Sequence, residues 1–374
     1  MKINKFIKPL AAVSAAAVML SAAGCADTSW SFKTSNAEIT NGMWIYKTYS
    51  NMNQAIQKYQ EETGNSIQPS DEDFADKKVE KKNIYDWIAD KSKDDCVEAL
   101  TIEKLIKDNK VTVDKESIES NVKMYEQYIT QYGMDTMYEQ LGVSMKSAAY
   151  MDSTLATYKE DLFKKLYDKE GTKAVKDDEV KKYFVDNYTD YYYIHYSFKT
   201  TDDDGNSTDI DDATKDKVTG AFAKYAKELN DGTKTTAEID EEYKTDFELG
   251  DDGSVPSTAS TEVLADSSMN EDVQKEIKAL GDKKATVKLI DDTYYLFYKG
   301  SISEKYNTIS DDETSANGIT RLSIVHKIKD DEFDKYIEAE KKKLKYDTNN
   351  DCISKYSVER TVKTYNDFVS SQSK

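Results

Sequence analysis

The chain has 374 residues and a formal net charge of −19 at pH 7, because 71 Asp and Glu residues outnumber 52 Lys and Arg residues. So acidic a chain is not suited to bind nucleic acid, and it has no basic patch that would hold it on anionic lipid. Its length is sufficient for two domains of ordinary size. After the N-terminal region, no apolar run approaches the roughly 20 residues that span a bilayer.

Residues 1–24 have the three-part layout of a secretory signal peptide. Three lysines lie among the first eight residues, an apolar segment runs over residues 9–20, and Ala-Ala-Gly precedes Cys25. A Cys at this place resembles the lipidation site of bacterial lipoproteins. That resemblance implies cleavage before Cys25 and diacylglycerol on its sulfur, with residues 25–37 as a lipidated tether. The alternative is an ordinary secretion signal in which Cys25 has no role.

Residues 38–175 carry the spacing of amphipathic helices. Apolar side chains recur at three and four positions, which predicts helices that bury their stripes against one another in one helical domain. Asp114 and Ser144 are suited to cap two of these helices, and Gly64 is suited to end another. The apolar stripes run from Ile45 to Tyr59, from Ile84 to Ile106, from Ile118 to Tyr132 and from Ala148 to Leu162.

Residues 176–305 have a different pattern. The aromatic-rich stretch 191–200 alternates and predicts a strand, whereas 202–212 and 250–260 predict loops. Helical stripes follow at 218–229 and 273–280. The runs 285–290 and 294–299, joined by Asp-Asp-Thr, predict a hairpin. The order strand, helix, helix, strand, strand predicts a small α+β domain. Helical stripes return in residues 306–374, with a turn at 346–350 and an ambiguous segment at 358–369.

The remaining cysteines, Cys96 and Cys352, leave two alternatives open: two buried thiols, or one long-range disulfide in an oxidising compartment. The sequence predicts no metal site, since it has only His195 and His326 and no Cys-x-x-Cys pair. It predicts no cofactor either. A phosphate-binding Gly-rich loop and a Gly-x-Ser-x-Gly elbow are both absent from the sequence.

The order of these parts resembles extracytoplasmic foldase lipoproteins with a helical chaperone-like domain and a parvulin-type (PpiC-like) peptidyl-prolyl isomerase domain. Segments 105–114 (LIKDNKVTVD), 140–145 (QLGVSM) and 175–188 (VKDDEVKKYFVDNY) look like junctions of that family. The stretch 194–198 (IHYSF) occupies the place of its first parvulin strand, and 279–298 that of its closing segment. The resemblance implies a mainly helical α+β fold, in which residues 306–374 return to pack on 38–175 and bring Cys96 towards Cys352.

The resemblance also implies a site, with departures. His195 corresponds to the His of the family's first strand. The closing strand of the family usually carries a second His, where this chain has Tyr295, and no residue here takes the place of the active-site Asp or Cys. We therefore expect weak or no prolyl cis–trans isomerase activity. The alternative for His195 is a strand residue satisfied by a backbone partner.

Client binding is the activity that the helical half favours. Methionine repacks readily against varied apolar partners, and most of the chain's 10 Met residues lie in this half. Met134 and Met137, in a short connector near Gly133, are predicted to be exposed and to bind clients. The alternative is that they belong to the core between helices.

Together these features predict a folding factor anchored by lipid to the extracytoplasmic face of the bacterial cell membrane. Its partners would be unfolded secreted polypeptides and the membrane, but no nucleic acid, and it would act as a monomer or a homodimer. The alternative function is that of a ligand-binding or surface scaffold lipoprotein without catalytic activity.

Overall fold

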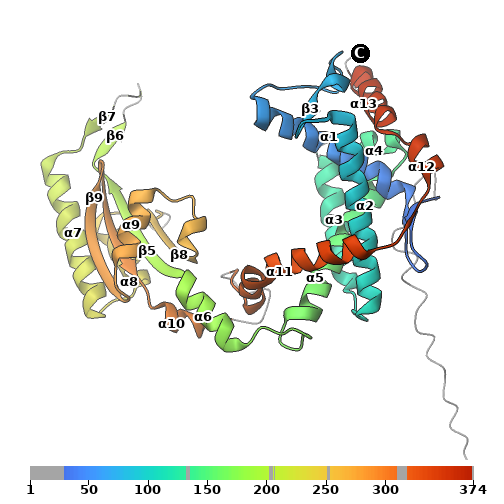
Figure 1. The fold of residues 1–374 in the computed structure, drawn as a ribbon. Helices are drawn as coiled ribbons and strands as arrows, with labels where there is room; N and C mark the ends of the chain where they lie inside the picture. Colours follow the sequence, from blue (N-terminus) through green and yellow to red (C-terminus); the bar gives the residue numbers. More distant parts are fainter. Residues whose placement is uncertain are drawn as a thin grey trace, which may run out of the picture. The chain divides into compact units, whose positions relative to one another are not determined.

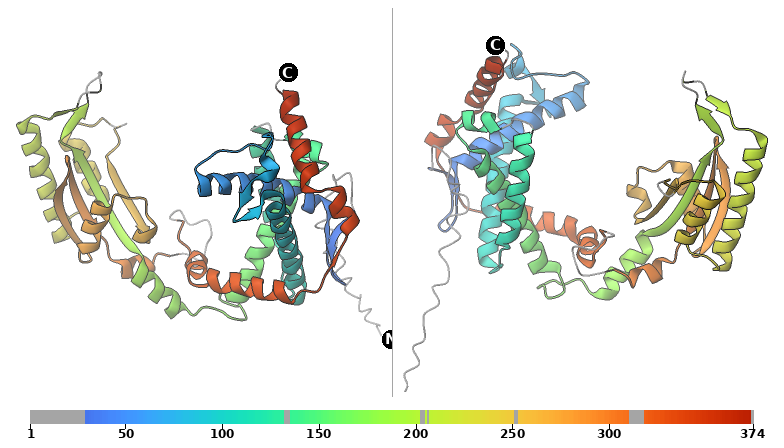
Figure 2. Two further views of the ribbon diagram at one scale, coloured as in Figure 1. Left: turned by 45° about the horizontal axis from the view of Figure 1, so that its top comes forward. Right: turned by 180° about the vertical axis from the view of Figure 1, so that it is seen from behind.

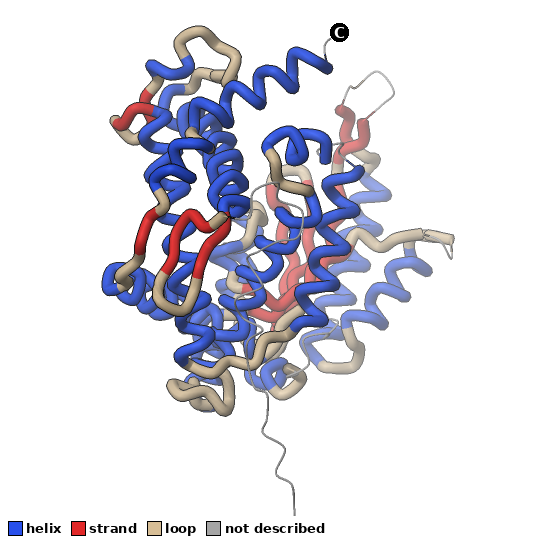
Figure 3. The backbone as a smooth tube through the Cα atoms, turned by 90° about the vertical axis from the view of Figure 1, so that its right-hand side faces the viewer, coloured by secondary structure: helices blue, strands red, loops and turns tan. Residues whose placement is uncertain are grey.

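The computed structural model describes residues 29–131, 135–201, 205, 207–250, 253–309 and 318–372. The chain forms two compact units, the first made of Met1–Ala174 and Lys329–Lys374 and the second of Val175–Ile328 (Figure 1). Helices predominate and most of the strands are short (Figure 3). The fold class is α+β and mainly helical, as the sequence predicts. Within the described ranges, no helix is both long enough and apolar enough to cross a membrane.

Helices make up most of the first unit, and their ends follow the sequence. The side chain of Ser144 accepts the backbone N–H of Ser147 at 3.1 Å, and Asp114 accepts that of Glu116 at 3.0 Å, so both predicted caps are confirmed. The helix before Gly64 ends there because Gly64 has φ 73°, a conformation that glycine adopts without strain. The helices are α1 (Asn41–Thr63), α2 (Ile84–Asp108), α3 (Lys115–Gln131), α4 (Asp135–Leu141), α5 (Met145–Tyr167), α12 (Asn350–Lys355) and α13 (Val358–Gln372), with α11 (Arg321–Lys343) running across the unit boundary.

A small sheet in the first unit corrects two predictions. Strand β1 (Trp30–Lys33) lies between β2 (Glu38–Thr40) and β11 (Asp347–Thr348), and both pairings are antiparallel. Phe32 is fully buried, so residues 30–33 belong to the core and are not a tether. The predicted turn at 346–350 contains β11. Strands this short carry too few residues for a period of two to show in the sequence. A separate two-stranded ribbon joins β3 (Lys78–Val79) to β4 (Lys82–Asn83).

The C-terminal segment of the chain contacts the N-terminal helices within the first unit. The indole N–H of Trp44 donates to the backbone carbonyl of Tyr356 at 2.8 Å, and the rings of Phe163 and Phe333 lie 5.4 Å apart. Helix α13 lies beside the N-terminal helices in both views of Figure 2. The predicted tail began too early, however, because residues 306–328 belong to the second unit.

The second unit is built on a four-stranded antiparallel sheet of order β8-β5-β10-β9. The predicted strand and hairpin are confirmed as β5 (Thr189–Ser197) and as β9 (Lys284–Ile290) with β10 (Thr293–Lys299). The predicted loop at 250–260 was wrong in its second half, since β8 (Ser257–Glu262) begins there. Its sequence, STASTE, has no apolar alternation to reveal it. The other elements are α6 (Asp177–Asn187), β6 (Lys199–Thr201), β7 (Ser207–Asp209), α7 (Asp212–Asp231), α8 (Thr236–Asp246), α9 (Glu271–Ala279) and α10 (Ile302–Tyr306).

Candidate functional site

The four-stranded sheet has one closely covered face and one partly covered face. On the first, Tyr192, Ile194 and Leu296 are buried under α7 and α8, in a core that includes Phe222 and Tyr225. Helix α9, which has only 9 residues, covers part of the second face (Figure 1). Tyr193 and Tyr295 pack against the cluster that α9 helps to form but stay half-buried, and with His195 they form the candidate site.

Three of these side chains form an aromatic cluster, which we define as Tyr193, His195 and Tyr295. His195 and Tyr295 are direct partners in the β5–β10 register, and their ring centroids lie 5.8 Å apart. The Tyr193 ring lies 6.3 Å from that of His195 and 6.0 Å from that of Tyr295. Because side chains on a strand alternate between faces, all three project from the same side of the sheet. The two residues predicted for the site thus lie opposite each other, and sequence reasoning missed Tyr193.

The imidazole of His195 is poorly solvated. Its Nδ1 is buried and has no hydrogen-bond partner in the described part of the chain. Burial lowers the pKa of His195, and the nearby Pro256 carbonyl opposes that shift only in part. Burial also raises the pKa of Tyr295, and the phenol of Tyr193 adds to this effect. At neutral pH the cluster therefore presents the neutral imidazole of His195 and the protonated phenol of Tyr295.

We expect the imidazole of His195 to titrate below the ordinary histidine value of about 6.5. Because the pKa is lowered in the folded chain, the unfolded chain binds more protons as the pH falls below about 6.5. His195 then contributes stability above that pH, and the contribution is lost as the pH falls towards the folded pKa. The chain has 2 histidines, so proton NMR should resolve both imidazoles, and His195→Gln would assign them. A midpoint at or above the ordinary value would contradict this prediction.

The chemistry that this cluster can perform is limited. Proline isomerisation breaks no covalent bond, but it has a rotation barrier of about 20 kcal/mol, and an enzyme lowers it by binding the twisted amide better than the planar one. The cluster offers apolar ring faces and phenol hydroxyls, with one imidazole. The second unit has no cysteine in its sequence, and the neighbouring carboxylate of Glu262 accepts the hydroxyl of Tyr191 at 2.6 Å. The arrangement suits binding better than catalysis.

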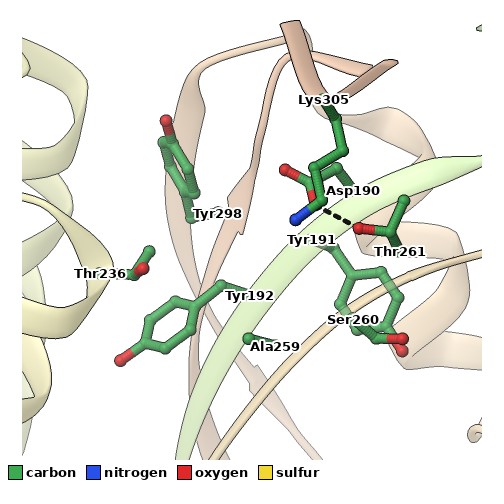
Figure 4. Close-up of a pocket in the computed structure, with 9 residues that line it drawn as sticks. All are labelled: Asp190, Tyr191, Tyr192, Thr236, Ala259, Ser260, Thr261, Tyr298 and Lys305. Carbon is green, nitrogen blue, oxygen red and sulfur yellow. Dashed lines mark hydrogen bonds and ion pairs between the residues drawn. The ribbon is translucent and has the colours of Figure 1, made fainter. Parts of the chain in front are cut away.

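A polar cavity of about 440 Å³ lies where β8, β5 and β10 meet the ends of α8 and α10 (Figure 4). Asp190 accepts the hydroxyl of Thr261 at 2.6 Å, and the ammonium of Lys305 lies 3.5 Å from the same carboxylate oxygen. The hydroxyl of Tyr192 donates to Asp240 at 2.6 Å. Sequence reasoning missed this cavity because its residues come from three strands and two helices, with no shared spacing. Its lining includes Asp190, Tyr192, Thr236, Thr261, Tyr298 and Lys305.

The structure tests only one of the two methionines predicted to bind clients. Met137 is only 3% exposed and packs in the main core of the first unit, so the prediction that it is exposed was wrong. Helix α4 turns that side chain inward, which the sequence of a short connector does not reveal. Met134 lies outside the described residues, as does Cys25. The exposed large apolar side chains of this region are instead Met124, at 65%, and Tyr128, at 55%, four positions apart on α3.

Neither Cys96 nor Cys352 forms a disulfide within the described part of the chain, and both thiols are buried. Burial raises the pKa of the Cys96 thiol, which makes it unreactive. The thiol of Cys352 lies against Asn41, at the start of α1, and is 3.4 Å from the hydroxyl of Ser29. Of the two alternatives left open by the sequence, the structure therefore shows two buried thiols and not the disulfide. No group of His, Cys, Asp and Glu side chains in the described ranges is arranged to hold a metal ion.

Neither a protein-family model nor a curated protein matches this sequence. Among solved structures, the crystal structure of PrsA from Bacillus subtilis matches with 17% sequence identity and a TM-score of 0.23. The match covers 76% of this chain and 88% of that chain. This chain is thus only weakly similar in structure to PrsA.

Proposed function

We propose that this chain is a protein-folding factor that holds unfolded secreted polypeptides at the extracytoplasmic face of the bacterial cell membrane. In this proposal, lipid on Cys25 anchors the chain, and the second unit has weak or no prolyl isomerase activity. The observation that carries the proposal is the half-buried aromatic cluster of Tyr193, His195 and Tyr295 on the partly covered face of the sheet.

Such a cluster suits an unfolded client. Tyrosine presents a large apolar ring to apolar side chains and proline rings, and its hydroxyl serves the backbone groups beside them. The rings are held in place by pairing across β5 and β10, so little side-chain entropy is lost on binding. The predicted signal peptide and Cys25 support a location where secreted chains emerge unfolded.

The same cluster supports only weak isomerase activity. With the pKa of His195 lowered, the imidazole is uncharged at neutral pH and supplies no positive charge to the amide. Tyr295 occupies the position opposite His195, and a phenol whose pKa is raised is a hydrogen-bond donor that holds its proton. Binding of a proline segment without fast turnover is the expected behaviour.

An aggregation assay tests the holding activity. The full mature chain at equimolar amount is expected to suppress light scattering by an unfolded client diluted from denaturant. The double variant Tyr193→Ser, Tyr295→Ser should need at least about five times more protein for the same suppression, since two aromatic contacts of about 0.5–1.5 kcal/mol each contribute about 1–3 kcal/mol together. Leu289→Ala is the matched control, because Leu289 is 49% exposed on the same sheet but away from the cluster.

If the wild-type chain suppresses no aggregation at equimolar amount, the proposal is wrong, and the alternative of a ligand-binding or scaffold lipoprotein gains support. The isomerase part has its own test, the cis–trans kinetics of a short proline peptide. Fast turnover by the wild-type chain that His195→Ala abolishes would contradict weak activity and make His195 a catalytic residue.

A further inference from the structure

The outer edge of β8 has backbone groups that no described residue pairs. β8 is an end strand of the four-stranded sheet, with β5 on its inner side. The N–H of His195 donates to the carbonyl of Pro256 at 3.1 Å, and the register pairs Tyr193 with Thr258. Hydrogen-bonded pairs alternate along an antiparallel ladder, so the backbone groups of Thr258 face β5 and those of Ala259 and Thr261 point outward.

The opposite edge of the sheet is blocked. The side chain of Asn230 on α7 pairs with both backbone groups of Ala285, donating to its carbonyl at 3.0 Å and accepting its N–H at 2.9 Å. Strand β9 also carries Lys284 and Lys288, and lysines on an edge strand discourage the pairing of another strand. β8 has neither a lysine nor a proline within it, and Ala259, at its middle, is exposed.

The polar cavity of about 440 Å³ adjoins this edge, with Ala259 and Thr261 among its lining residues. The cavity lies on the face of the sheet that carries Tyr192, beside α8. Helix α7 covers the same face over β9 and β10. A strand added at the edge of β8 would direct alternate side chains towards this face. The cavity can hold one long side chain of such a strand.

The charges around the cavity favour a basic side chain. Asp190 lines the cavity, and Asp240 accepts the hydroxyl of the lining residue Tyr192. The ammonium of Lys305 lies 3.5 Å from one oxygen of Asp190, so two carboxylates, those of Asp190 and Asp240, accompany this ammonium at the cavity. The rings of Tyr192 and Tyr298 offer apolar and cation–π contacts for the stem and head of Arg or Lys.

We propose that the outer edge of β8 binds an extended segment of polypeptide by strand addition, with an Arg or Lys side chain of that segment in the adjoining cavity. The backbone pairing gives affinity without regard to sequence, and the cavity selects the basic residue. This inference rests on the proposed function, since it names the class of client segment that the second unit holds.

Peptide binding to the full mature chain, measured by fluorescence anisotropy, tests this inference. The probe is a fluorescein-labelled peptide of nine residues, alternating Thr and Val, with a central Arg. We expect it to bind, and we expect a peptide with central Glu to bind at least about threefold more weakly, as a partly exposed charge pair contributes up to about 1 kcal/mol. Asp190→Asn should remove this preference. Equal affinity for both peptides, or tighter binding of the Glu peptide, would overturn the cavity's role.

Proline variants test the strand addition. Ala259→Pro removes an outward N–H without breaking the ladder to β5, and it should weaken binding about tenfold through one lost hydrogen bond and the bulk of the ring. Leu289→Pro, on the blocked edge, is the matched control and should change affinity less than about twofold. Peptides methylated on the alternate backbone nitrogens that would face β8 should bind wild type at least as weakly as the unmodified peptide binds Ala259→Pro.

Three outcomes would overturn the proposal. Unchanged peptide affinity in Ala259→Pro is the first. The second is self-association of the wild type that Ala259→Pro abolishes without any peptide binding, which would make β8 an interface between copies. The third is equal loss in Leu289→Pro while both variants keep the circular dichroism of the wild type, which would show that binding does not depend on the β8 edge. Aggregation suppression is measured separately, so intact suppression with any of these results leaves the proposed function standing.

Discussion

Replacing Phe32 by Ala is expected to lower the free energy of unfolding of the first unit by about 3–5 kcal/mol. The side chain is 0% exposed, and its ring lies 6.0 Å from that of Trp44 and 6.1 Å from that of Tyr346. Truncation to Ala removes these edge contacts and leaves a cavity between β1 and α1. The loss is comparable to the whole stability of a small domain, which is about 5–15 kcal/mol.

Urea unfolding followed by tryptophan fluorescence measures this effect, because Trp44 reports on the same core. Ser35→Ala is the matched control, since Ser35 is exposed in the turn between β1 and β2 and should change stability by less than about 0.5 kcal/mol. If Phe32→Ala also changes stability by less than about 0.5 kcal/mol, residues 30–33 are a tether after all, and the placement of β1 is wrong.

Cys25→Ser is expected either to release the chain from the membrane fraction to the soluble fraction or to leave its signal peptide uncleaved. The hydroxyl of serine is not alkylated in place of the thiol, and the diacylglycerol contributes about 0.8 kcal/mol for each buried CH₂ group. The net charge of −19 gives no electrostatic attraction to anionic lipid that would replace it. Fractionation of cells, with incorporation of labelled fatty acid, measures the effect.

Ala26→Ser is the control for Cys25→Ser, as it changes the neighbouring residue and keeps the thiol. It should remain in the membrane fraction and incorporate fatty acid. A Cys25→Ser chain that has lost residues 1–24 and still stays in the membrane fraction without incorporated lipid would contradict the lipoprotein hypothesis.

The position of β1 has a consequence for the anchored chain. Since β1 begins at Trp30, only four residues separate it from Cys25. Five residue steps span at most about 17 Å even when fully extended. A lipid on Cys25 would therefore keep the first unit close to the bilayer surface.

Much of the fold follows from periodicity in the sequence. The stripes from Ile45 to Tyr59 and from Ala148 to Leu162 predict α1 and α5, because a period near 3.6 is a local property that survives folding. The alternation in 191–200 predicts β5, because the period of two in a strand is also a local property. β1 and β8 escaped prediction, since four and six residues of mixed polarity become strands only when a neighbour supplies the hydrogen bonds.

The candidate site was predictable in part. Family resemblance indicated His195 and Tyr295, and the register of β5 against β10 brings the two rings within 5.8 Å. Tyr193, the third member, carries no motif and joins them only because β5 alternates between the two faces. Met137 shows the converse, since its residue type and its place in a connector predict exposure whereas packing buries it.

By itself, the sequence determined the signal-like N-terminus, the acidic character, most of the helices and the β9–β10 hairpin, because charge and periodicity are properties of neighbouring residues. The tertiary structure alone decided which side chains stay exposed, that the thiols of Cys96 and Cys352 are apart from any disulfide, and that β8 ends the sheet with an open edge. These features depend on contacts between residues far apart in the chain, whose formation is set by burial and hydrogen-bond pairing in the folded state.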